Sequence, residues 1–327
     1  MTDVVFRRAS KDDRHSILDL FWQISPVGRN VAYWEWLNLN GPWGPSLVEI
    51  VERDNMPIGH YAVMPVELRR GGEAITAGFA MQVGTHRSHR GLPNLRHMCD
   101  RVWSGCADAG MQFIYGFPNR HIWPIYKRMM NWQLIEQFRA LEYPFGDRGN
   151  PSIDRPTHLT IKRLTRFEDR FDSVWEGSTQ ASAQIFSLPR TARYLNWRFF
   201  DHPAQHYKVL GAWDGSEPVG YAVLKFYHDG TRFIGHIADI LTQKADAGAI
   251  ASGLLAAAFD AFSWQQVDSV SLWMSPADPI RPQIDALGFT ESGFESTMGL
   301  RPLGQPIPDT ALTLAGWNLT MADSDAF

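Results

Sequence analysis

The sequence contains two copies of one pattern, separated by a nearly constant offset. Trp36 and Trp197 are related by an offset of 161, and the run Pro-Ile-Gly at 57–59 returns as Pro-Val-Gly at 218–220 with the same offset. A fixed offset that holds across separate blocks is the signature of a repeated structural unit. In a chain of 327 residues it predicts two tandem copies of one fold.

The repeat continues along the chain at a slightly smaller offset. Thr85 corresponds to Thr242 and Trp132 corresponds to Phe289, in both cases with an offset of 157. Because the offset falls from 161 to 157, the second copy is four residues shorter between the two blocks. We expect a hairpin of different length to account for this difference.

Both copies show the same order of expected elements, which places the chain in the α+β class. Strands are expected at 46–51, 58–68, 74–84 and 112–117, and again at 208–213, 219–227, 232–241 and 269–274. A helix over 95–109, capped by Gly110, and an apolar helix over 249–262 precede the last strand of each copy. Short helices then end at Trp132 and Phe289. We predict two domains, 1–150 and 151–327, joined within the polar stretch 142–156.

Composition excludes several classes of protein. With 44% hydrophobic and 20% charged residues the chain is globular, and its net charge of −4 argues against nucleic-acid partners. There is no uninterrupted run of eighteen apolar residues and no apolar signal core at the N-terminus, so we expect no membrane insertion and a cytoplasmic location. Two cysteines, Cys99 and Cys106, predict neither a disulfide framework nor a metal site, and their spacing indicates a packed helix face.

A basic loop joins the third expected strand to the long helix of the first copy. It contains Arg87, Arg90 and Gly91 and opens directly onto the helix. Helix N-termini carry unpaired N–H groups and partial positive charge, so such a loop is able to bind phosphate. The alternative is a solvated surface loop. Nucleotide-binding, zinc-protease and serine-hydrolase motifs are absent from the sequence.

The element order and this loop together resemble the GNAT superfamily of acyl-coenzyme A-dependent N-acyltransferases. In that family the turn reads [Q/R]xxGx[G/A], and here Ser88–Pro93 keeps Gly91 but has Ser88 and Pro93 at the other positions. The resemblance implies two mixed, mostly antiparallel sheets flanked by helices, with acetyl-CoA or another acyl-CoA as cofactor. The implied cofactor-binding residues are Val83, Thr85, Arg87, Arg90, Gly91, Leu92, Asn94, Leu95 and Asn119. Pro93 is suited to the first helical position but removes one backbone donor, which arginine charge would have to replace.

A narrower resemblance concerns the stretch YGFPNRHIWPIYKRMMNW at 115–132 and the closing segment WNLTMADSDAF. Both look like a GNAT subgroup found among bacterial surface-polysaccharide genes, which implies an amino sugar as the small-molecule amine substrate. Ile122 and Asn131 depart from the pattern of that subgroup. Oligomeric state cannot be inferred from these motifs.

Several residues are candidates for the catalytic proton transfers. The resemblance places Tyr126 where a tyrosine protonates the leaving thiolate, although a packed aromatic residue fits the position as well. His121 is a candidate base, as are His60 and His86. Asp239 interrupts an apolar strand, where a charge is costly unless it is paired or functional.

Other ionisable residues are interpreted from their expected positions in the fold. By strand alternation, His236 and Asp239 are expected on opposite faces of the sheet. We expect Asp323 and Asp325 to be solvated, and the resemblance alone keeps them as ligand candidates.

The second copy lacks the basic loop. After its third strand it reads TQKADAGAI, with the acidic Asp246 and no Arg-Gly pair, so we expect this half to be degenerate in cofactor binding. The leading interpretation is an acyl-CoA-dependent N-acyltransferase that acetylates a small-molecule amine. The alternatives are a non-catalytic scaffold built from two degenerate copies, and an enzyme with a longer acyl or aminoacyl-tRNA donor.

Overall fold

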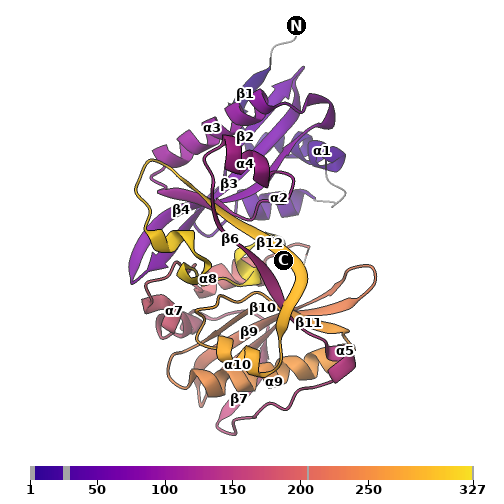
Figure 1. Cartoon of the computed structure of the whole chain (residues 1–327), viewed down its shortest axis with the longest axis vertical. Coiled ribbons are helices and arrows are strands. Elements are labelled where there is room, and N and C mark those ends of the chain that lie inside the picture. Colours follow the sequence, from indigo (N-terminus) through magenta and orange to yellow (C-terminus); the bar gives the residue numbers. More distant parts are fainter. Residues whose placement is uncertain (1–3, 25–29, 205, 326–327) are drawn as a thin grey trace.

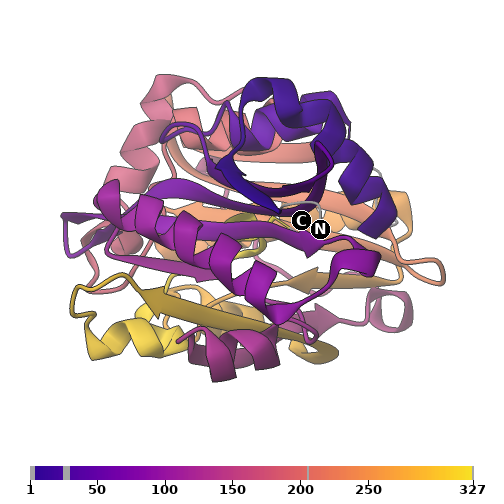
Figure 2. The same cartoon turned by 90° about the horizontal axis from the view of Figure 1, so that it is seen from above.

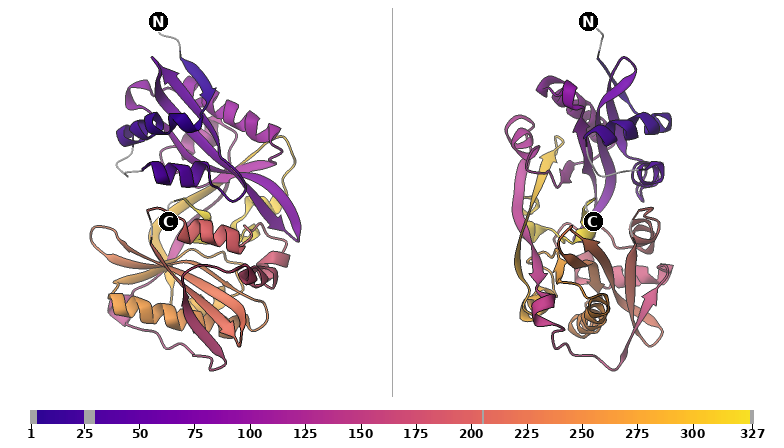
Figure 3. Two further views of the ribbon diagram at one scale, coloured as in Figure 1. Left: turned by 180° about the vertical axis from the view of Figure 1, so that it is seen from behind. Right: turned by 90° about the vertical axis from the view of Figure 1, so that its right-hand side faces the viewer.

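The computed structural model describes residues 4–24, 30–204 and 206–325. Two halves of similar build lie one above the other, and the chain's C-terminal end lies at the junction between them (Figures 1 and 3). The predicted strands and crossover helices are all present, with ends that differ by a few residues.

The first half comprises β1 (Val5–Arg8), α1 (Arg14–Ile24), α2 (Val31–Asn38), β2 (Leu47–Arg53), β3 (Met56–Arg70), β4 (Glu73–Thr85), α3 (Leu92–Asp108), β5 (Phe113–Gly116), α4 (Trp123–Met129) and β6 (Gln133–Tyr143). A short helix, α5 (Phe145–Arg148), lies in the stretch that joins the halves. The second half comprises β7 (Leu159–Leu164), α6 (Asp172–Glu176), α7 (Thr179–Ser182), α8 (Ala192–Leu195), β8 (Tyr207–Asp214), β9 (Glu217–His228), β10 (Phe233–Thr242), α9 (Ala247–Gln265), β11 (Ser269–Leu272), α10 (Arg281–Ala286) and β12 (Thr290–Pro302).

All twelve strands belong to one sheet, in the order β1-β2-β3-β4-β5-β12-β6-β11-β10-β9-β8-β7. Only the pairs β4–β5 and β10–β11 are parallel among the described strands, because a crossover helix connects the members of each pair. The other neighbours are antiparallel. The expected fold class, an α+β chain with a mixed, mostly antiparallel sheet in each half, is confirmed.

The last strand of each copy was not predicted from the sequence, and these two strands are exchanged between the halves. β6 belongs to the first copy but pairs with β11 of the second, whereas β12 belongs to the second copy and pairs with β5 of the first. β6 and β12 also pair with each other, antiparallel, at the centre of the sheet (Figure 1). The division at residue 150 remains a prediction, but these strands show that each half borrows one strand from the other copy.

A pair of repeat-related tryptophans lies on the approximate twofold axis that relates the halves. Trp36 and Trp197 stack with ring centroids 4.7 Å apart. The indole Nε1 of Trp36 donates to the carbonyl oxygen of Trp197 at 2.8 Å, and Nε1 of Trp197 donates to the carbonyl oxygen of Trp36 at 3.2 Å. The reciprocal contacts show that the repeat in sequence is a repeat in space.

The four-residue difference between the copies lies in one hairpin, as expected. β3 and β4 have 15 and 13 residues, whereas β9 and β10 have 12 and 10. Gly71 and Gly72, with φ of +57° and +85°, form the tip of the longer hairpin, where a side chain would be strained. The longer hairpin projects toward the second half and forms a bridge from Arg69 to Ser187.

Helices cover both faces of the sheet. In the first half α1 and α2 lie on one face, and α3 packs across the other (Figure 2). Cys99 and Cys106 are buried under α3, as expected, and burial raises the pKa of Cys106 to about 12. Among the described helices, only α9 is long and apolar enough to cross a membrane by length and composition. It is largely buried against the second-half strands, as a core helix would be.

Candidate functional site

The strands β4 and β5 diverge soon after they begin to pair. Their parallel pairing consists of Gly78 with Ile114 and Phe79 with Tyr115. Beyond Phe79, the described part of β4 is paired on its β3 side alone, and a β-bulge at Gln82, with φ of +47°, bends it further. We call the resulting gap between β4 and the chain after β5 the first slot; its open edge consists of backbone groups.

Gly116 marks where the first slot begins. A Cβ atom at this position would lie 3.1 Å from both Cβ and the carbonyl oxygen of Ala80. The two strands are therefore still in contact at Gly116 and separate only after it. The close approach explains why a glycine ends β5.

The basic loop and the start of α3 lie at the mouth of the first slot. Arg87, Arg90 and Gly91 are exposed, and Gly91 is the N-cap of α3 with no side-chain capping bond. The amides of the first helical turn are therefore left for another acceptor. Pro93 occupies the second helical position rather than the first, because α3 begins at Leu92.

The other predicted cofactor residues follow the same path. Val83 and Thr85 are half-buried on the last part of β4, and Asn94 is half-buried in the first turn of α3. Leu95 is buried in the core beneath α3. Leu92 is the first residue of α3, but its side chain lies outside the described part of the structure.

Asn119 and His121 lie on the loop that follows β5. The side-chain Oδ1 of Asn119 accepts from the backbone N–H groups of His121 and Ile122, at 2.9 and 3.2 Å. The carboxamide oxygen thus organises the turn before α4. The His121 side chain is exposed at this border of the slot.

Tyr126 lies in the core on the α3 side of the sheet. Its ring stacks on Trp132 at a centroid distance of 4.7 Å, and only 2% of the residue is exposed. Burial raises the pKa of Tyr126 well above its usual value. This geometry favours the packed-aromatic reading, and its role as a proton donor remains a prediction.

A narrow pocket lies between the halves, on the face of the first-half sheet opposite α3. Its volume is about 30 Å³. The first copy contributes Trp36, Leu37, Met64, Val66, Phe79 and Tyr115, and the second contributes Leu188, Tyr194, Trp197, Arg198, His202 and the segment Ala322–Asp325. We call this space the central pocket. Since Phe79 and Tyr115 are also the last paired residues of β4 and β5, the central pocket adjoins the inner end of the first slot.

A wider groove lies against the same tryptophan pair. It has a volume of about 600 Å³, and Trp36 and Trp197 line both it and the central pocket. Its walls are largely polar and come from equivalent positions of the two copies, such as Pro42 and Pro203.

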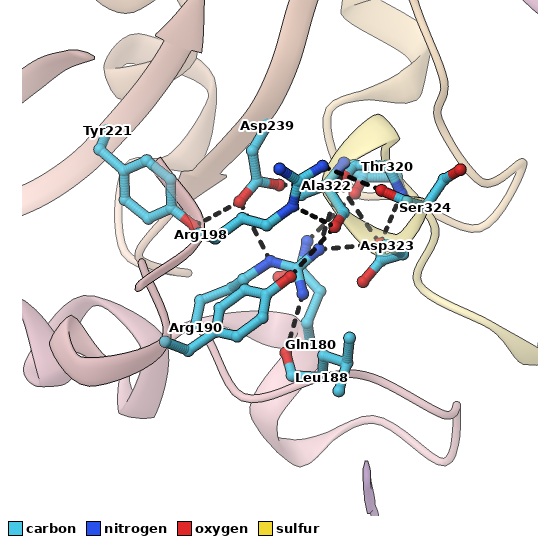
Figure 4. A network of polar contacts seen from close by, with 12 residues as sticks. Gln180, Leu188, Arg190, Arg198, Tyr221, Asp239, Thr320, Ala322, Asp323 and Ser324 are labelled. Atoms are coloured by element: carbon cyan, nitrogen blue, oxygen red, sulfur yellow. Dashed lines mark hydrogen bonds and ion pairs between the residues drawn. The ribbon is translucent and has the colours of Figure 1, made fainter. Parts of the chain in front are cut away.

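The corresponding gap in the second half is filled by an ion-pair network. β10 and β11 pair over Ile234–Ile237, and β10 then bulges directly before Asp239, the repeat equivalent of Gln82. Arg190, only 1% exposed, donates from Nε to Asp239 at 3.1 Å and from Nη2 to Asp323 at 2.8 Å (Figure 4). Burial lowers the pKa of Arg190, but the two carboxylates outweigh it and hold that pKa well above its usual value.

Two hydroxyl groups complete this network. Tyr221 donates to Asp239 at 2.8 Å, and Thr320 Oγ1 donates to the other Asp239 oxygen at 2.9 Å. Asp239 therefore fits the expectation that a charge in this strand is paired, and it does not line the central pocket.

Two expectations about these residues were wrong. Asp323 is not solvated but 6% exposed, because Arg190 and the backbone N–H of Thr320 bind its carboxylate. Asp325, by contrast, is exposed. His236 and Asp239 lie on the same face of the sheet, opposite Lys225 and Val223, because the β-bulge between them inserts an extra residue.

A second buried arginine also holds the segment Ala322–Asp325. Arg198 donates to the carbonyl oxygens of Ala322 and Ser324, at 3.1 and 2.9 Å (Figure 4). The segment is thus attached to the second half by both side-chain and backbone contacts. Arg190 and Arg198 were both missed in the sequence, although each lies close to the repeat-related Trp197.

The start of α9 lacks the features of the α3 N-terminus. Its N-cap Asp246 contacts His158 at 3.0 Å instead of capping the helix, and no arginine flanks it. A carboxylate at this end repels phosphate, so the start of α9 is a poorer phosphate site than the arginine-flanked start of α3. No cluster of three His, Cys, Asp or Glu side chains suited to a metal ion occurs in the described residues.

Comparison with known proteins agrees with this geometry. Residues 6–135 match the family model described as an acetyltransferase (GNAT) domain. Residues 6–135 are therefore similar to a GNAT acetyltransferase domain. No curated protein matches the sequence.

Solved structures extend the GNAT similarity to both halves. A GCN5-related N-acetyltransferase from Anabaena variabilis aligns with a TM-score of 0.71 and 15% identity, over 92% of this chain and 73% of its own. A probable N-acyltransferase from Enterococcus faecalis has a TM-score of 0.71 and 13% identity, with the same coverage. A tandem GNAT protein from the clavulanic acid biosynthesis pathway has a TM-score of 0.61 and 14% identity, over 93% of this chain and 100% of its own. The whole chain thus has a tandem GNAT fold.

Proposed function

We propose that this protein is an acyl-CoA-dependent N-acyltransferase whose donor binds to the first half. The observation that carries the proposal is the open first slot with the uncapped, arginine-flanked start of α3 at its mouth. The GNAT domain match over residues 6–135 covers this same region. The second half, in which the equivalent gap is filled, would serve as scaffold and pocket wall.

Each part of the donor has a place in this arrangement. The diphosphate would accept hydrogen bonds from backbone N–H groups at the start of α3 and be neutralised by Arg87 and Arg90. The amide groups of the pantetheine arm would pair with the open edge of β4 at Val83 and Thr85, as a further strand does. The acyl group would then reach the central pocket.

The reaction is a direct transfer. The lone pair of the acceptor nitrogen attacks the thioester carbonyl, the C–N bond forms, and the C–S bond breaks with its electron pair leaving on sulfur. The acceptor nitrogen releases one proton to a base. Among the three histidine candidates, His121 alone is exposed beside the slot, so we propose it as the proton acceptor.

The acceptor would be a small-molecule amine, and the resemblance to the polysaccharide-gene subgroup makes an amino sugar our first candidate. Trp36 and Trp197 line both the central pocket and the wide groove, so indole rings border the space in which a sugar ring would lie. Screening amino sugars as acceptors tests this assignment.

Calorimetric titration with acetyl-CoA tests the proposal. We expect micromolar binding at one site per chain, weakened at least about tenfold by Arg90→Glu, because a like charge then faces the diphosphate. Arg163→Glu on β7 is the matched control, since it makes the same charge change at an exposed position of the second half. Absence of binding by the unaltered protein would favour the scaffold reading, which the Ser88 and Pro93 departures motivate.

A further inference from the structure

The central pocket is narrow. Its volume is about 30 Å³, against roughly 300 Å³ for the smallest typical ligand pockets. A longer acyl chain therefore has to displace more of the walls than an acetyl group does. What holds the walls therefore decides which donors are accepted.

Most of the walls belong to the packed core. Phe79 and Tyr115 are 4% and 2% exposed, and Tyr115 packs against Trp317 at a centroid distance of 5.0 Å. Protein interiors of this kind do not yield to an extra methylene without cost. The remaining wall, Ala322–Asp325, differs because it belongs to no strand or long helix.

This last wall is held in place by the second half. Arg190 joins Asp239 on β10 to Asp323 in the wall, and Arg198 binds the carbonyl oxygens of Ala322 and Ser324. Figure 4 shows both guanidinium groups directed at the 320–324 turn. The contacts lie at the bulge of β10, where the first half carries Gln82 instead of Asp239.

We propose that the second half restricts the donor to short acyl groups by clamping the segment Ala322–Asp325 across the inner end of the first slot. Arg190, Asp239 and Asp323 form this clamp. They are positioning residues that act on donor selectivity without touching the reacting atoms. The proposal rests on the proposed function, because it assigns an acyl-length limit to the same donor site.

The experiment compares the affinities of free coenzyme A, acetyl-CoA and hexanoyl-CoA by calorimetry. For the unaltered protein we expect acetyl-CoA to bind at least about tenfold more tightly than hexanoyl-CoA, the discrimination that a closed apolar pocket provides. In Arg190→Gln the hexanoyl affinity should rise so that most of this preference is lost. The affinity for free coenzyme A, which has no acyl group, should stay within about twofold.

Hydrogen exchange over residues 317–325 reports the clamp without any donor. Arg190→Gln should raise the exchange rate of this segment and leave the first-half strands unchanged. Asp323→Asn weakens the same clamp by removing the carboxylate that Arg190 binds. It replaces Arg190→Gln in the experiment if the Arg190→Gln variant does not fold. Arg155→Gln is the matched control, because Arg155 pairs with Asp260 at 2.8 Å in the same half but on the surface.

Phe79→Leu gives a second, independent test by widening the pocket from the first-half wall. It should relax the acyl preference without changing exchange at 317–325.

A faster-exchanging segment with an unchanged acetyl preference would overturn the clamp proposal, as would equal binding of hexanoyl-CoA by the unaltered protein. If the unaltered protein binds neither coenzyme A nor either acyl-CoA, the proposed function is refuted, and the clamp proposal with it.

Discussion

The two halves place different side chains at one repeat-equivalent position. In the first half this position is Gln82, within the β-bulge of β4, and the described part of β4 beyond Phe79 is paired on its β3 side alone. In the second half it is Asp239, directly after the β-bulge of β10, where Arg190 joins it to Asp323. The side chain at this position therefore distinguishes a strand edge without a ladder partner from an internal ion-pair network.

The difference indicates how a duplicated half loses one role and acquires another. A buried aspartate needs a cationic partner, since an unpaired buried charge is strongly destabilising. Arg190 meets this need and, having more donors than one carboxylate uses, also binds Asp323 in the closing segment. The charge that blocks the second gap thus anchors a segment that borders the first-half pocket.

Removing Arg190 should give the largest effect on stability. Arg190→Ala leaves Asp239 and Asp323 buried without their cation, so we expect the free energy of unfolding to fall by about 3–5 kcal/mol. Urea unfolding followed by tryptophan fluorescence measures it. Arg155→Ala, which removes an exposed pair, should cost less than about 1 kcal/mol. Similar losses for both variants would show that the buried network contributes no more to the free energy of unfolding than an exposed ion pair does.

Acidic pH should destabilise the second half through His236. Burial, with Lys225 nearby, lowers the pKa of His236 to about 4, against 6.5 in the unfolded chain. The unfolded chain therefore binds the proton first, so the stabilising contribution is complete above pH 6.5 and is lost as the pH falls toward 4. We expect the loss attributable to this residue to be about 3 kcal/mol over that range.

The measurement is the free energy of unfolding at several pH values for the unaltered protein and for His236→Gln. Glutamine does not titrate, so the variant should show a shallower decline between pH 6.5 and 4. Parallel pH profiles for the two proteins would show that His236 remains neutral or charged equally in both states.

The tryptophan pair provides the test in which the halves should behave alike. Trp36→Phe and Trp197→Phe each delete one indole N–H and leave a buried carbonyl oxygen without that donor. Each should reduce the free energy of unfolding by about 1–3 kcal/mol, and the two losses should be similar because the contacts are reciprocal. Thermal unfolding of the two variants in parallel measures this, and a loss confined to one of them would contradict the twofold relation.

Much of the fold could be predicted from the sequence because the repeat shows local patterns twice. Strands such as β3 and β9 are bounded by Pro/Gly-rich turns. The loop with Arg87 and Arg90 lies directly before an amphipathic helix. These signals depend on neighbouring residues alone. The fold class, the crossover helices and the location of the four-residue difference followed from them.

The site at the junction of the halves could not be found in the same way. Arg190 is separated from Asp323 by 133 positions, and no local pattern distinguishes a buried arginine from a surface one. Strand alternation also failed at Asp239, because a bulge shifts the register by one residue and brings His236 and Asp239 to one face. Long-range pairing, including the exchange of β6 and β12, is decided by contacts that a single sequence does not display.

The exchange of β6 and β12 has a consequence for how the chain is made. During synthesis the first half leaves the ribosome with β5 as an open edge, since its permanent neighbour β12 has not yet been translated. β6 emerges early and has no β11 to pair with, so it is able to bind the wrong strand in the meantime. Folding of the N-terminal half is therefore completed only by residues near the other end of the chain, and its strand edges stay unpaired in the nascent polypeptide for longer than those of two independent domains would.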